Sequence, residues 1–243
     1  MIELTIVIPV LNEAKNISLL IPKIDQIRKN LKLKKFEILL VDDNSNDSTE
    51  FVVRGLKKKY RNLNLFIRKN KQKDLSKSCI LGFNKAIYKN ILVMDGDLQH
   101  HPKYIPKMLK VFIGKKCDIV IATRDFQKKV ELSFLRKTFS KMLIVIINAF
   151  LGNKTKDPMS GFFIFKKKIF FENRKKMYGK GYKILADLIY SSKKKLIMKD
   201  ITINFDRRIK GKSKMNFKIL VILINFIIEK YIKSIKYHLN KNN

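Results

Sequence analysis

The stretch ILVMDGDLQHHP, residues 91–102, decides how the chain can fold. Its first four residues are apolar and predict a buried β-strand, which Asp95 and Asp97 follow with one glycine between them. Residues two apart on an extended chain point to the same side, with Cα atoms roughly 6.6 Å apart at about 3.3 Å rise per residue. One or both carboxylates can therefore face a single hard cation such as Mg²⁺ or Mn²⁺, and Gly96 leaves room for a ligand. The alternative is a strand that ends in an acidic turn.

Outward from this stretch, apolar β-type runs alternate with helix-like segments. Strands are expected at residues 4–10, 36–41, 63–68, 91–94 and 118–124, and helices at 16–30, 49–60, 75–89 and 104–112. This alternation predicts βαβ units and an α/β, Rossmann-like domain with a mostly parallel central sheet. In such sheets ligands bind beyond the carboxyl ends of the strands.

Three of the expected strands carry carboxylates just past that end. Glu13 follows the first strand, Asp42 and Asp43 follow the second, and Asp95 and Asp97 follow the fourth. Several carboxylates on one edge of a sheet repel one another unless a cation and ligand hydroxyl groups lie among them. The three acidic turns together therefore favour a ligand site over a coincidence of surface turns.

Composition bounds the class of protein. The 243 residues are 46% hydrophobic, enough for one α/β domain with or without a small annex. The net charge of +34 favours anionic partners, namely nucleic acid, an acidic membrane surface or phosphorylated substrates, although runs of lysine are also typical of solvated faces. Cys79 and Cys117 form no CxxC motif, which argues against a disulfide framework or a zinc site and fits a reducing compartment. No signal-peptide pattern is evident at the first residues.

The second half of the chain has a different character. Residues 132–151 are strongly apolar, but their longest uninterrupted apolar run, 142–147, is too short to span a bilayer, so we expect either a core helix or a helix in the membrane interface. A turn and a strand are expected over 157–165, a helix over 179–192 and a strand over 200–205.

A basic loop and an apolar segment follow. Arg207, Arg208, Lys212 and Lys214 cluster around a glycine, which suits a phosphate group, although a solvated basic loop is the alternative. Residues 217–228 are nearly all apolar and are flanked by lysines. This segment can dock on anionic lipid or pack under the main domain.

Six segments, taken in order, resemble the inverting family-two nucleotide-sugar glycosyltransferases, and within them the dolichyl- or polyprenyl-phosphate mannosyltransferase branch. They are IPVLNE, VDDNSNDST, MDGDLQHHP, DPMSGFFIF, GYKI and FDRRIKGKSKM. The resemblance implies a GT-A type domain over residues 1–215, with a nucleotide half over about 1–125 and an acceptor half over about 126–215. Beyond the segments that carry the resemblance, the apolar and lysine-rich residues 216–243 are expected to form a basic amphipathic tail, and interface helices are expected beside the domain.

The resemblance assigns roles to individual residues. The nucleotide would be surrounded by Pro9, Leu11, Glu13, Val41 and Asp43. The metal, Mg²⁺ or Mn²⁺, and the diphosphate would be held by Asp95, Asp97 and Gln99, with Gly96 between the carboxylates. The donor phosphates would contact Arg208 and Lys214, which with Asp97 would act on the leaving group. The lipid phosphate would contact Arg124, Arg136, Ser140 and Ser160.

Four positions depart from the family pattern. Leu11 replaces an aromatic residue that would stack on the nucleobase, Asp74 stands where glycine is usual, Asp187 stands where glutamate is usual, and Gly96 replaces alanine. His100 and His101 directly follow the metal motif and are expected to be loop residues, with metal ligation as the alternative.

The implied function is transfer of mannose from GDP-mannose to a polyprenyl or dolichyl phosphate, with inversion, by a cytoplasmic protein associated peripherally with the membrane. UDP-glucose as the donor is one alternative, and a hydroxyl acceptor with Asp187 as the general base is another. A nucleic-acid-binding protein and a lipid-surface module without catalysis are the non-enzyme alternatives. Nucleic acid is not the expected partner, because the aromatic residues lie mainly in apolar runs.

Overall fold

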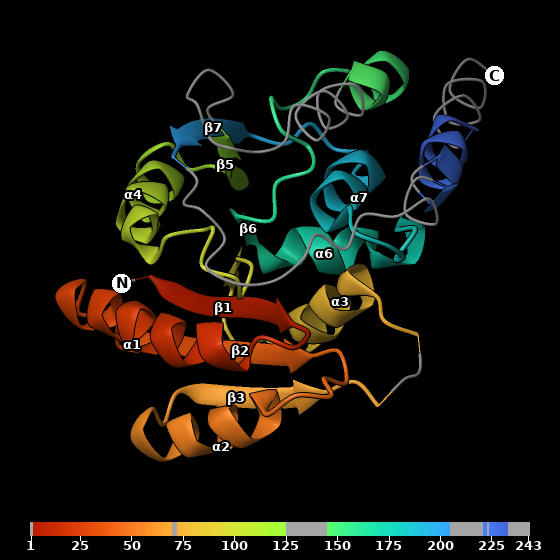
Figure 1. Ribbon diagram of the computed structural model, residues 1–243. Coiled ribbons are helices and arrows are strands. Elements are labelled where there is room, and N and C mark those ends of the chain that lie inside the picture. Colours follow the sequence, from red (N-terminus) through yellow and green to blue (C-terminus); the bar gives the residue numbers. More distant parts are fainter. Residues whose placement is uncertain (1, 70–71, 125–144, 205–220, 223, 233–243) are drawn as a thin grey trace.

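The computed structural model describes residues 2–69, 72–124, 145–204, 221–222 and 224–232. Within these residues a seven-stranded sheet has the order β3-β2-β1-β4-β6-β5-β7 (Figure 1). The strands are β1 Glu3–Val10, β2 Lys35–Asp42, β3 Leu63–Ile67, β4 Asn90–Val93, β5 Ile119–Arg124, β6 Phe163–Lys166 and β7 Met198–Ile203. All neighbouring pairs are parallel except those of β6, which runs antiparallel to β4 and β5. The expected α/β fold with a mostly parallel sheet is confirmed.

Helices connect the strands. They are α1 Ala14–Asn30, α2 Thr49–Lys59, α3 Leu75–Lys85, α4 Ile105–Gly114, α6 Lys167–Asn173 and α7 Ile184–Ser191, with short 3₁₀ helices at Pro102–Tyr104 and Arg174–Lys176. Residues 145–151, 221–222 and 224–232 are also helical. None of the helices in the described ranges is long and apolar enough to cross a membrane.

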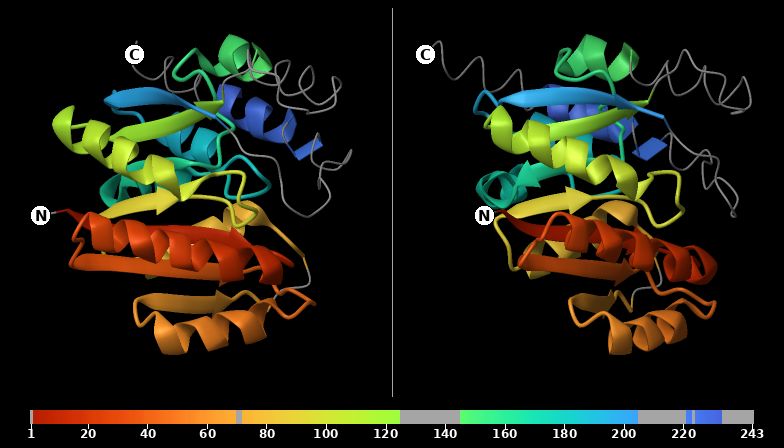
Figure 2. Two further views of the ribbon diagram at one scale, coloured as in Figure 1. Left: turned by 60° about the vertical axis from the view of Figure 1, so that its left-hand side comes forward. Right: turned by 90° about the vertical axis from the view of Figure 1, so that its left-hand side faces the viewer.

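The sheet is buried on both faces, as its continuous apolar strands require. Alternate residues of β1 show this: Ile6 and Ile8 pack in a core with α1, α2 and α4, whereas Val7 packs in a second core with α3, α6 and α7. In the right-hand view of Figure 2, α1 and α4 lie in front of the sheet. The two layers of helices leave the ends of the strands as the place for a ligand.

Three expected elements differ from the structure. The helix expected over 75–89 ends at Lys85, because Ala86 leaves the helical conformation with φ −55° and ψ 129°. The helix expected over 179–192 begins only at Ile184, because Gly179 and Gly181 adopt φ +68° and +84°. The strand expected over 200–205 is β7, Met198–Ile203, and α6 was not expected.

The antiparallel strand β6 positions part of the site. Its first residue, Phe163, pairs with Val93, the last residue of β4. Because β6 runs opposite to β4, the residues that precede β6 lie next to the residues that follow β4. Ser160 and Gly161 are therefore brought to the edge where Asp95 stands.

Candidate active site

The carboxyl ends of β2, β1 and β4 lie side by side, since these strands are neighbours in the sheet. The backbone pairing continues past the strand ends, with Asp43 N–H donating to the Val10 carbonyl at 2.9 Å and Met94 N–H donating to the Val7 carbonyl at 3.2 Å. The three acidic turns predicted from the sequence therefore follow adjacent strands of one sheet.

The turn after β1 is fixed by the loop after β2. Asn12, at φ +60°, donates its backbone N–H to Ser45 Oγ at 2.8 Å, and Glu13 donates its backbone N–H to Thr49 Oγ1 at 3.0 Å. The carboxylate of Glu13 accepts a hydrogen bond from Asn16 at 2.6 Å. These bonds hold the backbone and the side chain of Glu13, one of the residues expected around the nucleotide.

The remaining residues expected around the nucleotide on β1 and β2 are neighbours. Pro9 pairs with Val41 in the parallel register of the two strands, and Leu11, which is half-buried, follows Pro9 by two residues. Pro9, Leu11, Glu13, Val41 and Asp43 thus lie on the neighbouring strands β1 and β2 and in the turns that follow them.

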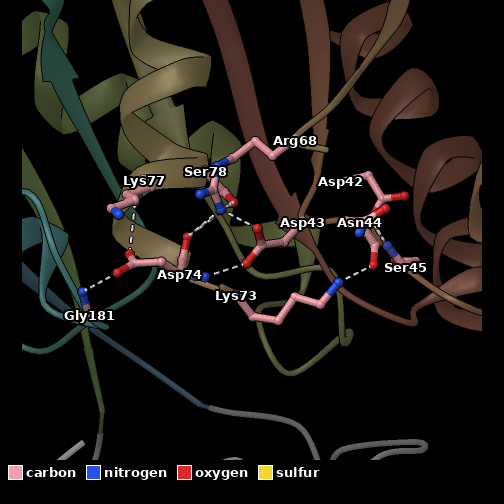
Figure 3. Close-up of polar contacts among 10 residues, drawn as sticks. All are labelled: Asp42, Asp43, Asn44, Ser45, Arg68, Lys73, Asp74, Lys77, Ser78 and Gly181. Carbon is pink, nitrogen blue, oxygen red and sulfur yellow. Dashed lines mark hydrogen bonds and ion pairs between the residues drawn. The ribbon is translucent and has the colours of Figure 1, made fainter. Parts of the chain in front are cut away.

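Asp43 forms a buried ion pair with Arg68, a residue that the sequence analysis missed (Figure 3). Arg68 also donates to the Asp74 carbonyl at 3.2 Å and to Ser78 Oγ at 3.3 Å. Burial raises the pKa of Asp43, and the backbone N–H of Asp74 and the guanidinium of Arg68 oppose that rise. Arg68 ends the run LFIR, and a lone arginine after a strand is a weak signal.

Asp42, although adjacent, has a different environment. Its Oδ1 accepts hydrogen bonds from the backbone N–H of Ser45 at 2.9 Å and from Ser45 Oγ at 2.6 Å (Figure 3). Lys73 donates to the Asn44 carbonyl in the same loop. Asp42 therefore shapes the loop after β2, whereas Asp43 lies in the polar network at the sheet edge.

Asp95 and Asp97 differ in exposure. The side chain of Asp95 is 37% exposed, whereas Asp97 is 4% exposed and accepts a hydrogen bond from the backbone N–H of Gln99 at 3.1 Å. Carboxylate oxygens are hard ligands. No group of three or more His, Cys, Asp or Glu side chains that could hold a metal ion occurs in the described part of the chain. The donors fit a hard divalent cation that takes its other ligands from water and phosphate oxygens, as Mg²⁺ commonly does.

Gly96 and Gly161 both lie close to these carboxylates, but they leave room for different neighbours. A β-carbon on Gly96 would lie 3.0 Å from Val10 Cγ1 and 3.3 Å from Ile17 Cδ1, so this glycine makes room for the core rather than for a ligand. A β-carbon on Gly161 would lie 2.7 Å from Asp95 Oδ2. The room for the exposed carboxylate is therefore made by Gly161, which the sequence analysis did not single out.

His100 supports the backbone of the carboxylate motif. It is buried, stacks on Phe162 with ring centroids 5.2 Å apart, and accepts the backbone N–H of Asp95 at Nδ1, at 3.1 Å. His101 accepts the backbone N–H of Lys103 at 3.0 Å and begins a 3₁₀ helix. Both contacts hold the backbone of the loop, as expected for loop residues.

The residues expected around the acceptor phosphate are only partly described. Ser160 is buried, and its hydroxyl donates to the Ala122 carbonyl at 2.6 Å, which ties the turn before β6 to β5. Arg124 is the last residue of β5 and pairs with Ile203 of β7. The other predicted contacts to the acceptor and donor phosphates lie outside the described residues, namely Arg136, Ser140, Arg208 and Lys214.

Asp187, the candidate base for a hydroxyl acceptor, is enclosed by donors. Its carboxylate lies 2.7 Å from Lys230 Nζ, with side-chain exposures of 4% and 3%. It also accepts backbone N–H groups from Tyr178 at 2.9 Å and Gly179 at 2.7 Å. This carboxylate supports structure around it and does not lie open to an acceptor.

Comparisons with known proteins show which family the chain resembles. Residues 5–172 match the family described as Glycosyl transferase family 2. A dolichol-phosphate mannosyltransferase of Pyrococcus furiosus is 34% identical over 220 residues, which cover 89% of this chain and 60% of that protein. One of Saccharomyces cerevisiae is 27% identical over 247 residues, covering 95% of this chain and 88% of that protein. The chain thus spans about 60% of the length of the Pyrococcus relative.

Solved structures show the same fold. A crystal structure of glucosyl-3-phosphoglycerate synthase from Mycobacterium tuberculosis, in complex with Mn²⁺, UDP-glucose and phosphoglyceric acid, superposes with a TM-score of 0.70. It is 15% identical, with 95% of this chain and 79% of that chain covered. The family match covers well over half of the chain, and the resemblance inferred from its motifs is confirmed: the chain belongs to glycosyl transferase family 2.

Proposed function

We propose that the protein transfers mannose from GDP-mannose to a polyprenyl or dolichyl phosphate. The observation that carries this proposal is the match to dolichol-phosphate mannosyltransferases of an archaeon and two fungi, at 26–34% identity over 89–95% of this chain. The carboxyl ends of β2, β1 and β4 supply the surface on which a nucleotide sugar would lie. The nucleotide half over about 1–125 would hold the donor, and the half over about 126–215 would hold the acceptor.

In this proposal the donor site offsets the negative charge of the nucleoside diphosphate with a bound metal ion. Asp95 and Asp97 would hold a divalent metal, Mg²⁺ or Mn²⁺, together with Gln99. When bound, the metal would stabilise the negative charge of the nucleoside diphosphate as it leaves. The Asp97 carboxylate accepts the backbone N–H of Gln99, the backbone N–H of Asp95 is held by His100, and Gly161 leaves room for the Asp95 carboxylate. Such fixed groups lower the reorganisation that the reaction needs.

The enclosure of Asp187 supports a phosphate acceptor. A hydroxyl acceptor needs a base to remove its proton, whereas a phosphate monoester, with a second pKa of about 6, is already largely ionised at neutral pH. Asp187 is buried against Lys230 and is not placed to act as a base. An acceptor that arrives ionised needs no base, only groups that position it; Arg124 and Arg136 are proposed as the cations and Ser140 as a hydroxyl donor.

We further propose that the protein works at the surface of an anionic membrane. Among the described residues 221–222 and 224–232, five side chains are exposed and apolar or aromatic at helical spacing, so they share one helix face: Val221, Ile224, Ile228, Tyr231 and Ile232. Tyr231 contacts Phe150, itself exposed, at a ring-centroid distance of 5.6 Å. We call these six residues the apolar face, and the net charge of +34 would draw it to anionic headgroups.

The proposal is tested by supplying purified protein with radiolabelled GDP-mannose or UDP-glucose, Mn²⁺ or Mg²⁺, and polyprenyl phosphate. We expect a labelled lipid product from GDP-mannose, and none when polyprenol replaces polyprenyl phosphate. A labelled product that forms with UDP-glucose and not with GDP-mannose would show that UDP-glucose is the donor. Product from polyprenol would contradict the phosphate acceptor.

A further inference from the structure

A lysine far along the chain is buried in the body of the protein. Lys230, in the helical residues 224–232, lies 2.7 Å from Asp187 Oδ1. The same ammonium donates to Ser191 Oγ at 2.6 Å and to the Lys176 carbonyl at 2.9 Å. If the two residues of a buried ion pair separate, or if one is replaced, the remaining charge is left buried without a partner, which is strongly destabilising. The last described segment is thus fixed to α7.

Asp187 in turn holds residues 178–182, which we call the glycine loop. Two backbone N–H groups at its start, those of Tyr178 and Gly179, donate to the two carboxylate oxygens. Gly181, at φ +84°, packs so closely against Ile222 that a β-carbon would lie 2.7 Å from its Cγ2. The C-terminal segment therefore contacts the glycine loop both through the ion pair and directly.

The other end of the glycine loop is bonded to Asp74, as Figure 3 shows. The backbone N–H of Gly181 donates to Asp74 Oδ2 at 2.9 Å, and the Gly181 carbonyl accepts the N–H of Ser76 at 2.8 Å. Asp74 Oδ1 accepts the N–H of Lys77 at 3.0 Å and so caps α3. The carboxylate at the position where the family usually has glycine thus joins the loop to the start of a helix.

Asp74 then contacts the nucleotide edge. Its backbone N–H donates to Asp43 Oδ2 at 2.5 Å, and its carbonyl accepts from Arg68, which pairs with Asp43 (Figure 3). A continuous set of bonds therefore runs from Lys230 through Asp187, the glycine loop and Asp74 to Asp43. A shift of the loop would move the donor that orients the Asp43 carboxylate.

We propose that Lys230 is a positioning residue for the donor nucleotide, acting through Asp187, the glycine loop and Asp74 on Asp43. This inference rests on the proposed function only in assigning Asp43 to the nucleotide. The helical residues 221–222 and 224–232, which include Lys230, would therefore support the donor site and also carry five of the six residues of the apolar face.

The test measures nucleotide binding by the full chain with Mn²⁺, using GDP or UDP, whichever binds the wild type more tightly. We expect Lys230→Met to raise the Kd about fivefold or more, the lower range of coupling between two sites. Lys166→Met is the matched control, because Lys166 pairs with Asp118 at 2.9 Å at the opposite, amino-terminal edge of the sheet. It should leave the Kd within about twofold of the wild type, because its pair lies at the opposite edge of the sheet from the donor site. An unchanged Kd in Lys230→Met would overturn the inference.

The route is tested by a double-mutant cycle. In an Asp74→Gly background, which removes the bond to Gly181, Lys230→Met should change the Kd less than about twofold. The same fold-change in both backgrounds would contradict the route through Asp74. If Lys230→Met does not fold, Lys230→Met/Asp187→Asn removes both buried charges, and we expect its Kd to rise as well. Nucleotide binding without mannose transfer in the wild type would contradict the proposed function and leave this test valid.

Discussion

The carboxylate of Asp95 lies directly over Gly161. A β-carbon at Gly161 would stand 2.7 Å from Asp95 Oδ2 and 2.9 Å from Oδ1. Asp95 follows β4 and Gly161 precedes β6. Because these strands are antiparallel neighbours, the two residues meet at one end of the pair. The position of the exposed carboxylate therefore depends on a glycine 66 residues away in the sequence.

Replacing Gly161 tests this dependence. Gly161→Ala places a methyl group where the carboxylate now lies, so we expect transfer to fall about tenfold or more, since small displacements of reacting groups carry large kinetic costs. Initial rates measure the effect. Gly55→Ala is the control, because nothing lies within 4 Å of that position on α2, and it should leave the rate unchanged. Equal rates in the two variants would contradict the role of Gly161.

The buried pair of Asp43 and Arg68 predicts a large effect on stability. Arg68→Met leaves the Asp43 carboxylate buried without its guanidinium partner, and we expect the free energy of unfolding to fall by about 3–5 kcal/mol. Denaturant titration measures it. Arg68→Met/Asp43→Asn should recover most of the loss, because the unpaired charge is gone. A loss below about 1 kcal/mol in the single variant, as for a surface pair, would show that the pair is not buried in solution.

Asp47 predicts a pH-dependent contribution to stability. It accepts hydrogen bonds from the backbone N–H groups of Ala14 and Thr49, where α1 and α2 begin. Burial tends to raise the pKa of Asp47, but the hydrogen bonds from Thr49 and Ala14 outweigh it, and the pKa is lowered. The ionised form therefore stabilises the folded state. We expect Asp47→Ala to cost about 1 kcal/mol at neutral pH.

The sign of the pH effect follows from the lowered pKa. The contribution of Asp47 is fully present above its unfolded-state pKa of about 3.9, and it is lost as the pH falls through the lower folded-state pKa. The difference in unfolding free energy between wild type and Asp47→Ala should therefore shrink below about pH 4. A difference that stays constant down to pH 2 would contradict it.

The apolar face predicts binding to anionic vesicles. Ile224→Glu/Ile228→Glu adds two negative charges to this face, and we expect co-sedimentation with phosphatidylserine-containing vesicles to fall at least about fivefold, while nucleotide binding is unchanged. Phe51→Glu, on α2, is the control, since Phe51 is 80% exposed but does not belong to the face. If both variants bind vesicles as the wild type does, the apolar face is not the contact surface.

The strands, and the carboxylates at the carboxyl ends of β1, β2 and β4, could be predicted because each is encoded by a short continuous stretch of sequence. Continuous apolar runs such as residues 4–10 require burial on both faces, and carboxylates after such runs fall on one edge of a parallel sheet. The antiparallel direction of β6 is decided by pairing with β4 and β5, and no pattern within residues 157–165 encodes it.

The residues missed by sequence analysis act over long separations. Arg68 is paired with Asp43, and Lys230 with Asp187, 43 residues apart in the latter case. Neither lysine nor arginine is distinctive in a chain with 54 such residues. The helix expected over 179–192 begins only at Ile184, because Gly179 and Gly181 have positive φ angles where the glycine loop contacts Asp187 and Asp74.

The central claim is that this chain transfers mannose to a polyprenyl phosphate with Asp95 and Asp97 at the diphosphate. The most direct measurement is the formation of radiolabelled mannosyl-lipid from GDP-mannose by the wild type, Asp95→Asn and Asp97→Asn, each with Mn²⁺ and with excess EDTA. We predict product with the wild type and Mn²⁺, a fall of about 100-fold or more in both variants, and none with EDTA. Wild-type rates in both variants, or no lipid-linked mannose from the wild type, would contradict the account.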